Sequence, residues 1–487
     1  MRFRPLARSS LAPLAAALAL LASCSQSGGG GSPGQYSTCA PAAGPTLDSC
    51  DPGFDAGSNA AGTVEVTFSG EYLGETNGLP FPPTNLQDPF FVDGWSVSFE
   101  EILVVVGNFR LQPGTQSQEV WNWVTQPGAA GPVATKPGPF VIDMHNIPQT
   151  FPGKEGNDYS QPLFMWTAQD NGQSFATNGP DAPYAFSYDV MQASYPATQV
   201  NLTAQGVADY GLMVQNGWSK LYRGKAVYVG SWPENQAASP SVSCSALATV
   251  ATTTVVNDFL EADAKSPVYF MFGWNDATRV LNCCNSDFFS STVSCESPTG
   301  NPTPAAWGIQ PTLSGEVTAQ VTLHVDHAFW DFLRRETPSN LRFDPIATWA
   351  PLATTPDAPF DLRELAPGGP FGVVPLAATF SDGTPLPDRA LCQAQFAAAN
   401  ADPYGTASDP EDQSPIAEVI VNPNGVPTAN LPGLADFMAF SAQSQMHLNN
   451  NALCYIEGQH PGDLPVTAAN PGGWYLPSIA YPSATTP

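Results

Sequence analysis

The sequence predicts a mainly β protein, a β-sandwich or jelly-roll-like fold with a few short helices and long Pro/Gly-rich loops. Three observations predict this class. Several segments alternate apolar and polar residues, proline and glycine number 50 and 42 among 487 residues, and only 12% of the residues are charged. Alternation with a period of two is typical of strands that bury one face. The many prolines exclude long helical bundles and coiled coils.

Each predicted strand is an alternating or apolar run bounded by turn residues. Loops rich in proline, glycine, asparagine and aspartate separate these runs, as they do in β-sandwiches. In chain order, the expected strands are 62–68, 95–99 running on through 102–106 and 108–111, 185–190, 226–229, 268–272 and 317–325.

Four short helices are expected between and after these strands. The run 205–215 ends at Asn216-Gly217, a sequence that commonly terminates a helix. The stretch 344–382 is rich in proline and is expected to be a long loop. The other three expected helices are 328–335, 387–400 and 434–446.

The N-terminus has the features of an export signal. A short basic segment precedes the apolar run Leu11 to Leu21, which is too short to span a bilayer. The tetrapeptide Leu21-Ala22-Ser23-Cys24 then resembles the lipobox of bacterial lipoproteins. This resemblance implies that residues 1–23 are a signal peptide and that Cys24 carries acyl chains. Ser25, rather than aspartate, after the cysteine implies onward sorting to the outer membrane, on its periplasmic or surface face.

Replacing Cys24 with alanine is therefore expected to prevent lipid attachment, because the thiol is the nucleophile that takes the diacylglycerol. The variant should accumulate as a soluble protein or an uncleaved precursor. Radiolabelled palmitate should enter the wild-type chain alone, and its failure to enter wild type would rule out a lipoprotein.

After Cys24 the chain divides into a tether and a large folded part. Residues 24–60 begin with a flexible Gly/Ser-rich segment, and residues 61–487 are expected to form one large β-rich domain or two subdomains, 61–310 and 311–487. The net charge of −27 makes nucleic acid a poor partner and favours the approach of cations.

Cysteine usage supports an oxidising compartment, since eight cysteines remain after Cys24 and an even number outside the cytosol indicates disulfides. Local spacing suggests the pairs Cys39–Cys50 and Cys392–Cys454, which leaves the other four to pair among themselves. The adjacent Cys283 and Cys284 could instead bind a soft metal, although no C-x-x-C spacing accompanies them. The eight candidates are Cys39, Cys50, Cys244, Cys283, Cys284, Cys295, Cys392 and Cys454.

The five histidines have informative neighbours. Asp143-Met144-His145 places a carboxylate and an imidazole two residues apart, which puts them on one face of an extended segment. The segment 324–327, His-Val-Asp-His, repeats this spacing, with His327 on the apolar face unless the strand ends there. His447 is expected at the end of a helix, and His460 lies in a Gly/Pro loop.

Imidazole and carboxylate suit borderline divalent metals, and histidines from distant segments can converge in a folded sandwich. The sequence therefore suggests a copper or zinc site made of His145, His324 and His447, with His327 as a further donor. Asp143 or Asp326 would orient a ring. The alternative is that each Asp–His pair is a local hydrogen-bonded structural unit.

Three segments, FVDGWSVSFEEILVVVGNFRL (91–111), AQVTLHVDHAFW (319–330) and SQMHLNNNALCYI (444–456), resemble parts of secreted proteobacterial lipoproteins. The strands before Leu111 are, more remotely, similar to those of the MbnP and CorA group of surface copper proteins. This resemblance implies a β-rich fold that binds copper through histidines and an oxidised tryptophan. The Trp-x-His spacing of that group is absent here, so the resemblance assigns no ligand position.

The sequence gives little indication of catalysis, since it contains no G-x-S-x-G, HExxH, P-loop or EF-hand motif. Glu100 and Glu101 are consecutive in a strand and face opposite ways, so they are not an acid–base pair. A second function remains open, a surface module that binds a glycan or an envelope protein without metal. In it, Trp121 and Trp123 would stack on sugar rings, although aromatic residues also fill sandwich cores.

Overall fold

The computed structural model divides the chain into two units, Met1–Gln35 and Tyr36–Pro487, and every residue described below belongs to the second. The structure describes residues 37–39, 63–84, 88–91, 93–113, 132–149, 151–154, 158–166, 184–230, 265–283, 285, 308–311, 316–330, 341–350, 355–365, 369, 434–449 and 452–456.

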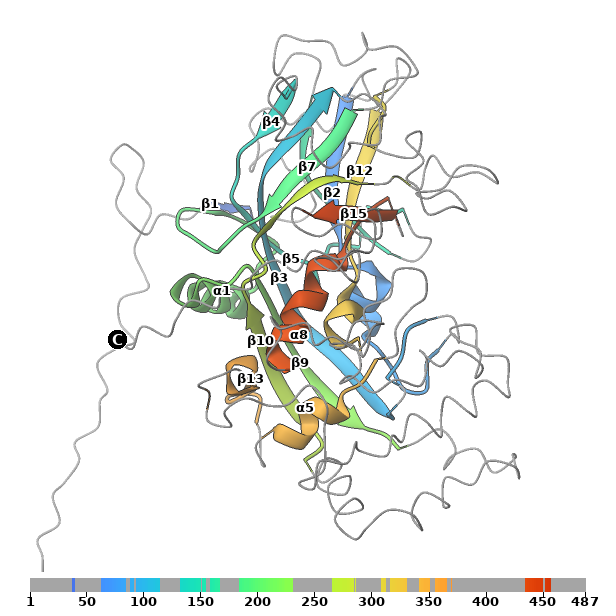
Figure 1. The fold of residues 1–487 in the computed structure, drawn as a ribbon, viewed down its shortest axis with the longest axis vertical. Coiled ribbons are helices and arrows are strands. Elements are labelled where there is room, and N and C mark those ends of the chain that lie inside the picture. Colours follow the sequence, from blue (N-terminus) through green and yellow to red (C-terminus); the bar gives the residue numbers. More distant parts are fainter. Residues whose placement is uncertain are drawn as a thin grey trace, which may run out of the picture. The chain divides into compact units, whose positions relative to one another are not determined.

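The prediction of a mainly β fold is confirmed, because the strands form two mixed sheets and the described helices are few (Figure 1). The larger sheet is organised around β3, a continuous strand over Trp95–Pro113 that joins three predicted runs. Strand β3 pairs with β9, β7, β5 and β4, and β9 pairs in turn with β10. The strands of this sheet are β1 (Ser37–Cys39), β3, β4 (Ala134–Lys136), β5 (Phe140–Asp143), β7 (Tyr184–Val190), β8 (Thr198–Val200), β9 (Lys220–Tyr228), β10 (Val268–Trp274), β11 (Thr278–Cys283), β13 (Phe360–Asp361) and β15 (Ala452–Ile456).

The smaller sheet carries the candidate site. Its order is β6 (Gln161–Trp166), β2 (Thr63–Ser69), β12 (Glu316–Leu323), β14 (Met446–Leu448) and β15, which also pairs with β11 of the larger sheet. Strands β2 and β12 run parallel, and the other pairs within this sheet are antiparallel. Because β2 and β12 pair along seven residues, strands from both sides of residue 310 share one sheet.

The core between these elements is aromatic. The alternation in β2 buries Val64, Val66 and Phe68 completely, which accounts for the regular pattern seen in the sequence. Phe68 packs edge-on against Phe109 and Tyr188 at ring-centroid distances of 6.0 and 6.5 Å. Trp95, Trp166 and Trp274 are also buried, so these tryptophans fill the core rather than a surface.

Helix α1 (Ala204–Asn216) confirms the helix predicted at 205–215. The hydroxyl of Thr203 caps its first turn by accepting the Gly206 N–H at 2.9 Å, and Gly217 ends it with a left-handed φ of 67°. Its residues Tyr210 and Met213 pack with Leu103 and Val105 of β3, whereas neighbouring residues of β3 face the main core. Among the described helices, none combines the length and hydropathy that a membrane span requires.

The helix predicted at 434–446 is confirmed as far as Gln445, as α8 (Leu434–Ser441) and a 3-10 helix (Ala442–Gln445), after which the chain pairs as β14 between two strands. Two other helix and loop predictions are corrected. Of the helix expected at 328–335, the described part does not fit, since a 3-10 helix over Val325–Phe329 ends before an extended Trp330, and residues 331–335 lie outside the described residues.

The expected loop 344–382 contains α5 (Asp344–Trp349), β13 and a 3-10 helix at Leu362–Leu365. Its prolines do not prevent this helix, since proline is tolerated in a first turn and one stands at the start of α5. The helix expected at 387–400 lies outside the described residues.

The predicted cysteine pairing is also corrected. A disulfide joins Cys283 of β11 to Cys454 of β15, so Cys454 does not pair with Cys392, and Cys283 is not linked within the group of four. The two cysteines are direct partners in the antiparallel register of β11 and β15, 171 residues apart in sequence. Only the backbone of Cys39 is described, and the remaining cysteines lie outside the described residues.

Candidate metal centre

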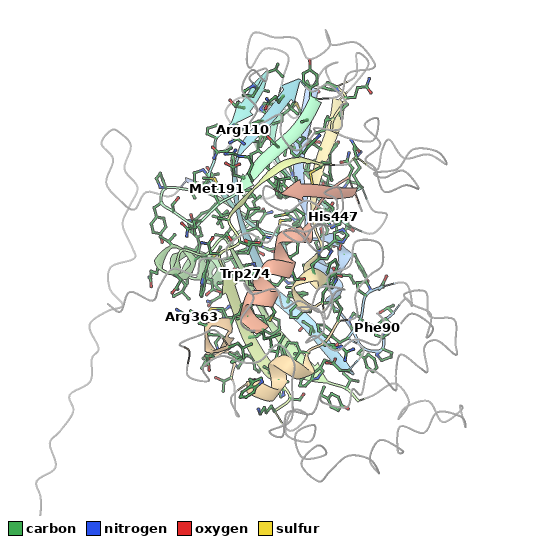
Figure 2. All side chains as sticks on the ribbon, in the orientation of Figure 1. Phe90, Arg110, Met191, Trp274, Arg363 and His447 are labelled. Atoms are coloured by element: carbon green, nitrogen blue, oxygen red, sulfur yellow. A yellow bond between two sulfur atoms is a disulfide. The ribbon has the colours of Figure 1, made fainter. Side chains whose placement is uncertain are left out.

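Three histidines converge where β12 and β14 lie side by side. His324, His327 and His447 each offer one ring nitrogen, and these three atoms all lie within 4.8 Å of one another. His327 and His447 are buried, and His324 is partly buried. Figure 2 shows His447 beside the C-terminal end of α8. Three imidazoles of this kind are a donor set that both zinc and copper accept.

Local backbone structure explains why His327 joins the cluster. The strand prediction placed His324 and Asp326 on one face and His327 on the other, but β12 ends at Leu323. His324 is extended, with φ −80° and ψ 101°, and the following residues form a 3-10 helix. Since a 3-10 helix has three residues per turn, positions 324 and 327 come to the same side, with ring centroids 5.4 Å apart.

The third histidine arrives through strand pairing. Thr322 of β12 is the direct partner of His447 in β14 and also of Ser69 in β2. The His324 and His447 rings stack at a centroid distance of 3.7 Å and an interplanar angle of 16°. Because imidazole lone pairs lie in the ring plane, one of these parallel rings must turn before both can bind one ion.

The backbone of the cluster is tied to the segment that follows α8. The His324 N–H donates to the carbonyl of Gln445 at 2.9 Å, and the Ser441 hydroxyl donates to the carbonyl of His327 at 2.5 Å. Both Ser441 and Gln445 are fully buried. These contacts hold the two main-chain positions while leaving the imidazoles for other partners.

Two carboxyl groups and an indole surround the histidines. The Glu71 Oε1 atom lies 2.8 Å from His324 Nε2. Asp326 Oδ2 accepts the indole N–H of Trp330 at 2.9 Å, and the Trp330 ring lies 3.6 Å from the His327 ring between centroids. Burial raises the pKa of Asp326, His324 opposes that effect, and the nearby charge of Glu71 adds to it. Asp326 was predicted to orient a histidine ring. Its carboxyl group instead orients the indole of Trp330.

His145 and Asp143 form a separate structural unit, which corrects their predicted place in the site. The described metal-ligand cluster contains His327 and not His145. One oxygen of Asp143, Oδ1, accepts the backbone N–H groups of Ile102 and His145 at 3.2 and 3.0 Å. His145 Nδ1 lies 2.7 Å from the carbonyl oxygen of Gly74. This pair matches the alternative of a local hydrogen-bonded unit.

Sequence reasoning missed Glu71 and Trp330 as neighbours of the site. Glu71 follows a strand whose parallel partner β12 lies some 250 residues later, and no local pattern reveals that pairing. Trp330 stands three residues after His327, the spacing that brings two side chains to the same side of a 3-10 turn, but the sequence did not predict that turn. Trp121, Trp123, His460 and Cys24 lie outside the described residues.

No family model, curated protein or solved structure matches this chain.

Three buried carboxyl groups outside the cluster make stability depend on pH. Burial is the main cause that raises the pKa of Glu75 and of Glu101 to about 8 and that of Asp143 to about 6. For Glu101, the neighbouring Asp209 adds to this effect, while the Thr203 hydroxyl, which donates at 2.5 Å, opposes it. These groups keep protons in the folded state that they lose in the unfolded state, where a glutamate titrates near pH 4.3.

The metal-free protein is therefore expected to be more stable at pH 5 than at pH 8. The contribution of each group is complete below its unfolded pKa and is lost as the pH rises through its folded pKa, at up to about 1.4 kcal/mol per pH unit and proton. Urea unfolding between pH 5 and 8 measures this slope. Glu101→Gln should make the dependence of the unfolding free energy on pH less steep. An unfolding free energy that increases from pH 5 to pH 8 would contradict the raised pKa values of these groups.

Proposed function

We propose that this chain binds one transition-metal ion, of the copper or zinc class, through His324, His327 and His447. The observation that carries the proposal is the convergence of three ring nitrogens within 4.8 Å, two from the segment that ends β12 and one from β14, more than 100 residues later. Neutral imidazole is a good ligand for both metals, and most of the site is shielded from water. The net charge of −27 favours the approach of a cation.

The cellular setting of this function follows from the N-terminal sequence. In this proposal the mature protein begins at Cys24 and is held by lipid at the outer membrane, and the Gly/Ser-rich segment separates the domain from the lipid surface. The metal site then faces the cell envelope or the exterior, where copper and zinc are captured or handed on. A binding role of this kind requires no catalytic group.

Elemental analysis of protein purified without an affinity tag tests the proposal. We expect close to one equivalent of copper or zinc per chain, either as isolated or after loading and removal of loosely bound ions. Removal with a chelator and reloading should restore the same amount. Less than about a tenth of an equivalent of either metal after loading would contradict metal binding at this cluster.

A further inference from the structure

We propose that Glu71 is the fourth donor of this site and that its carboxylate makes the site select a divalent ion over Cu⁺. This inference rests on the proposed function and names the ion class that the cluster takes. The observation behind it is the 2.8 Å approach of Glu71 Oε1 to His324 Nε2. Glu71 is 7% exposed, so this carboxylate lies inside the fold beside the histidines.

The backbone conformation of Glu71 is unfavourable for a residue with a side chain, which indicates that the surrounding structure holds the side chain in this position. Its φ is 56°, in the left-handed region that costs a residue with a side chain about 1 kcal/mol or more. The other described residues outside glycine with positive φ are Asn108, Asn201 and Asn449, and asparagine tolerates this conformation well. A glutamate in this position is therefore an exception, and it is the one that reaches a histidine of the cluster.

The turn before Glu71 fixes the direction of its side chain. Gly70 follows β2 directly, and a Cβ atom there would lie 2.3 Å from the carbonyl oxygen of Met144. The backbones of Gly70 and Met144 therefore pack closely, and this contact fixes the course of the main chain that leads to Glu71. The Glu71 N–H donates to the Ser69 hydroxyl at 3.1 Å. Ser69 is the register partner of Thr322, which in turn pairs with His447. The turn thus brings the carboxylate to the edge of the histidine cluster.

The spacing of the pair suits insertion of an ion. Two donors held about 2.0–2.2 Å from a tetrahedral ion lie about 3.4 Å apart. The Glu71 and His324 atoms are 2.8 Å apart. An opening of about half an ångström would place an ion between these two donors. Together with the turn of one of the stacked His324 and His447 rings, it would give the three-histidine, one-carboxylate set that four-coordinate zinc accepts.

The charge of this donor decides the preferred ion. Carboxylate oxygen is a hard ligand, which suits Zn²⁺ and Cu²⁺ better than Cu⁺, whereas Cu⁺ favours soft sulfur donors. In a buried site, one negative charge also stabilises a divalent ion more than a monovalent one. A cluster of three neutral imidazoles alone would lack that discrimination.

Glu71→Gln tests the inference in the full chain, because glutamine keeps the size of the side chain and removes its charge. Zn²⁺ affinity is measured by competition with a chelator, and Cu⁺ affinity by competition with bathocuproine disulfonate under reducing conditions. The matched control is Glu75→Gln. Glu75 lies four residues further along the chain, in a π-helix over Leu73–Asn77. It is buried and accepts hydrogen bonds from the Ser69 hydroxyl and the Tyr159 N–H, neither of which belongs to a histidine.

We expect Glu71→Gln to weaken Zn²⁺ binding at least about 10-fold and to change Cu⁺ binding much less, while Glu75→Gln leaves both affinities as in wild type. The visible spectrum of Co²⁺ bound to Glu71→Gln should also differ from wild type, because the donor set changes. Unchanged Zn²⁺ affinity, or an equal loss for both ions, would overturn the role of Glu71 while leaving the histidine site intact. A wild-type chain that binds neither ion would instead overturn the proposed function, and this inference with it.

Discussion

Replacing His447 with alanine is expected to lower the affinity for Zn²⁺ by more than about 100-fold, a larger loss than removal of an outer-shell partner causes. The His447 ring stacks on His324 at 3.7 Å and stands at 84° to His327 at 5.3 Å, so it contacts both other rings of the cluster. Its removal takes one of the three imidazoles out of the proposed four-donor set and leaves two imidazoles and Glu71 to hold the ion. Chelator competition on the purified variant measures the loss.

The matched control is His145→Ala. His145 is partly buried and follows β5 closely, but its ring nitrogen contacts the Gly74 carbonyl and it lies outside the cluster. This variant should bind Zn²⁺ as wild type does. Equal losses in both variants would show that the effect comes from damage to the fold, and full binding by His447→Ala would show that the three histidines are structural.

The elements that could be predicted from sequence are those with a local signal. Strands β2 and β7 alternate along one buried face, and α1 ends at a glycine that adopts the left-handed conformation. Strands β5 and β6 have no such signal, because every residue in each is buried and nothing alternates. Strand β14 has only three residues and begins directly after a helix, so no change of sequence pattern marks where it starts.

The site shows the same division between local and distant information. The candidate residue types are visible in the sequence, because imidazoles and acids two to three residues apart stand out in any strand or turn. Their grouping is not visible, since the choice between His145 and His327 depends on where β12 ends and on a pairing of segments more than 100 residues apart. The cost of closing such loops changes slowly with length, so spacing along the chain cannot identify the partners.

Replacing Lys220 with methionine is expected to destabilise the protein by about 3–5 kcal/mol, the range measured when one partner of a buried ion pair is removed. Lys220 Nζ lies 2.5 Å from Asp276 Oδ2, and the two side chains are 0% and 1% exposed. Burial lowers the pKa of Lys220, and Asp276 opposes that effect. Without the ammonium group, the Asp276 carboxylate remains buried with no cation beside it. Urea unfolding at pH 7 measures the change.

The same lysine also contacts the segment that precedes His447. Its ammonium group donates to the Ala442 carbonyl at 2.8 Å and to Gln445 Oε1 at 3.3 Å, in the 3-10 helix that precedes β14. The Gln445 carbonyl in turn accepts the His324 N–H. Lys220→Met should therefore also weaken metal binding, through a looser turn rather than a lost ligand.

Two further variants separate the buried charge from general damage. Lys220→Met combined with Asp276→Asn should be less destabilising than Lys220→Met alone, because no net charge is then left in the core. Arg279→Ala removes an ion pair whose side chains are 32% and 17% exposed, and Arg110 still pairs with Asp189, so it should cost no more than about 1 kcal/mol. A loss for Lys220→Met as small as that of Arg279→Ala would mean that water reaches Asp276 and that the pair does not hold the turn before His447.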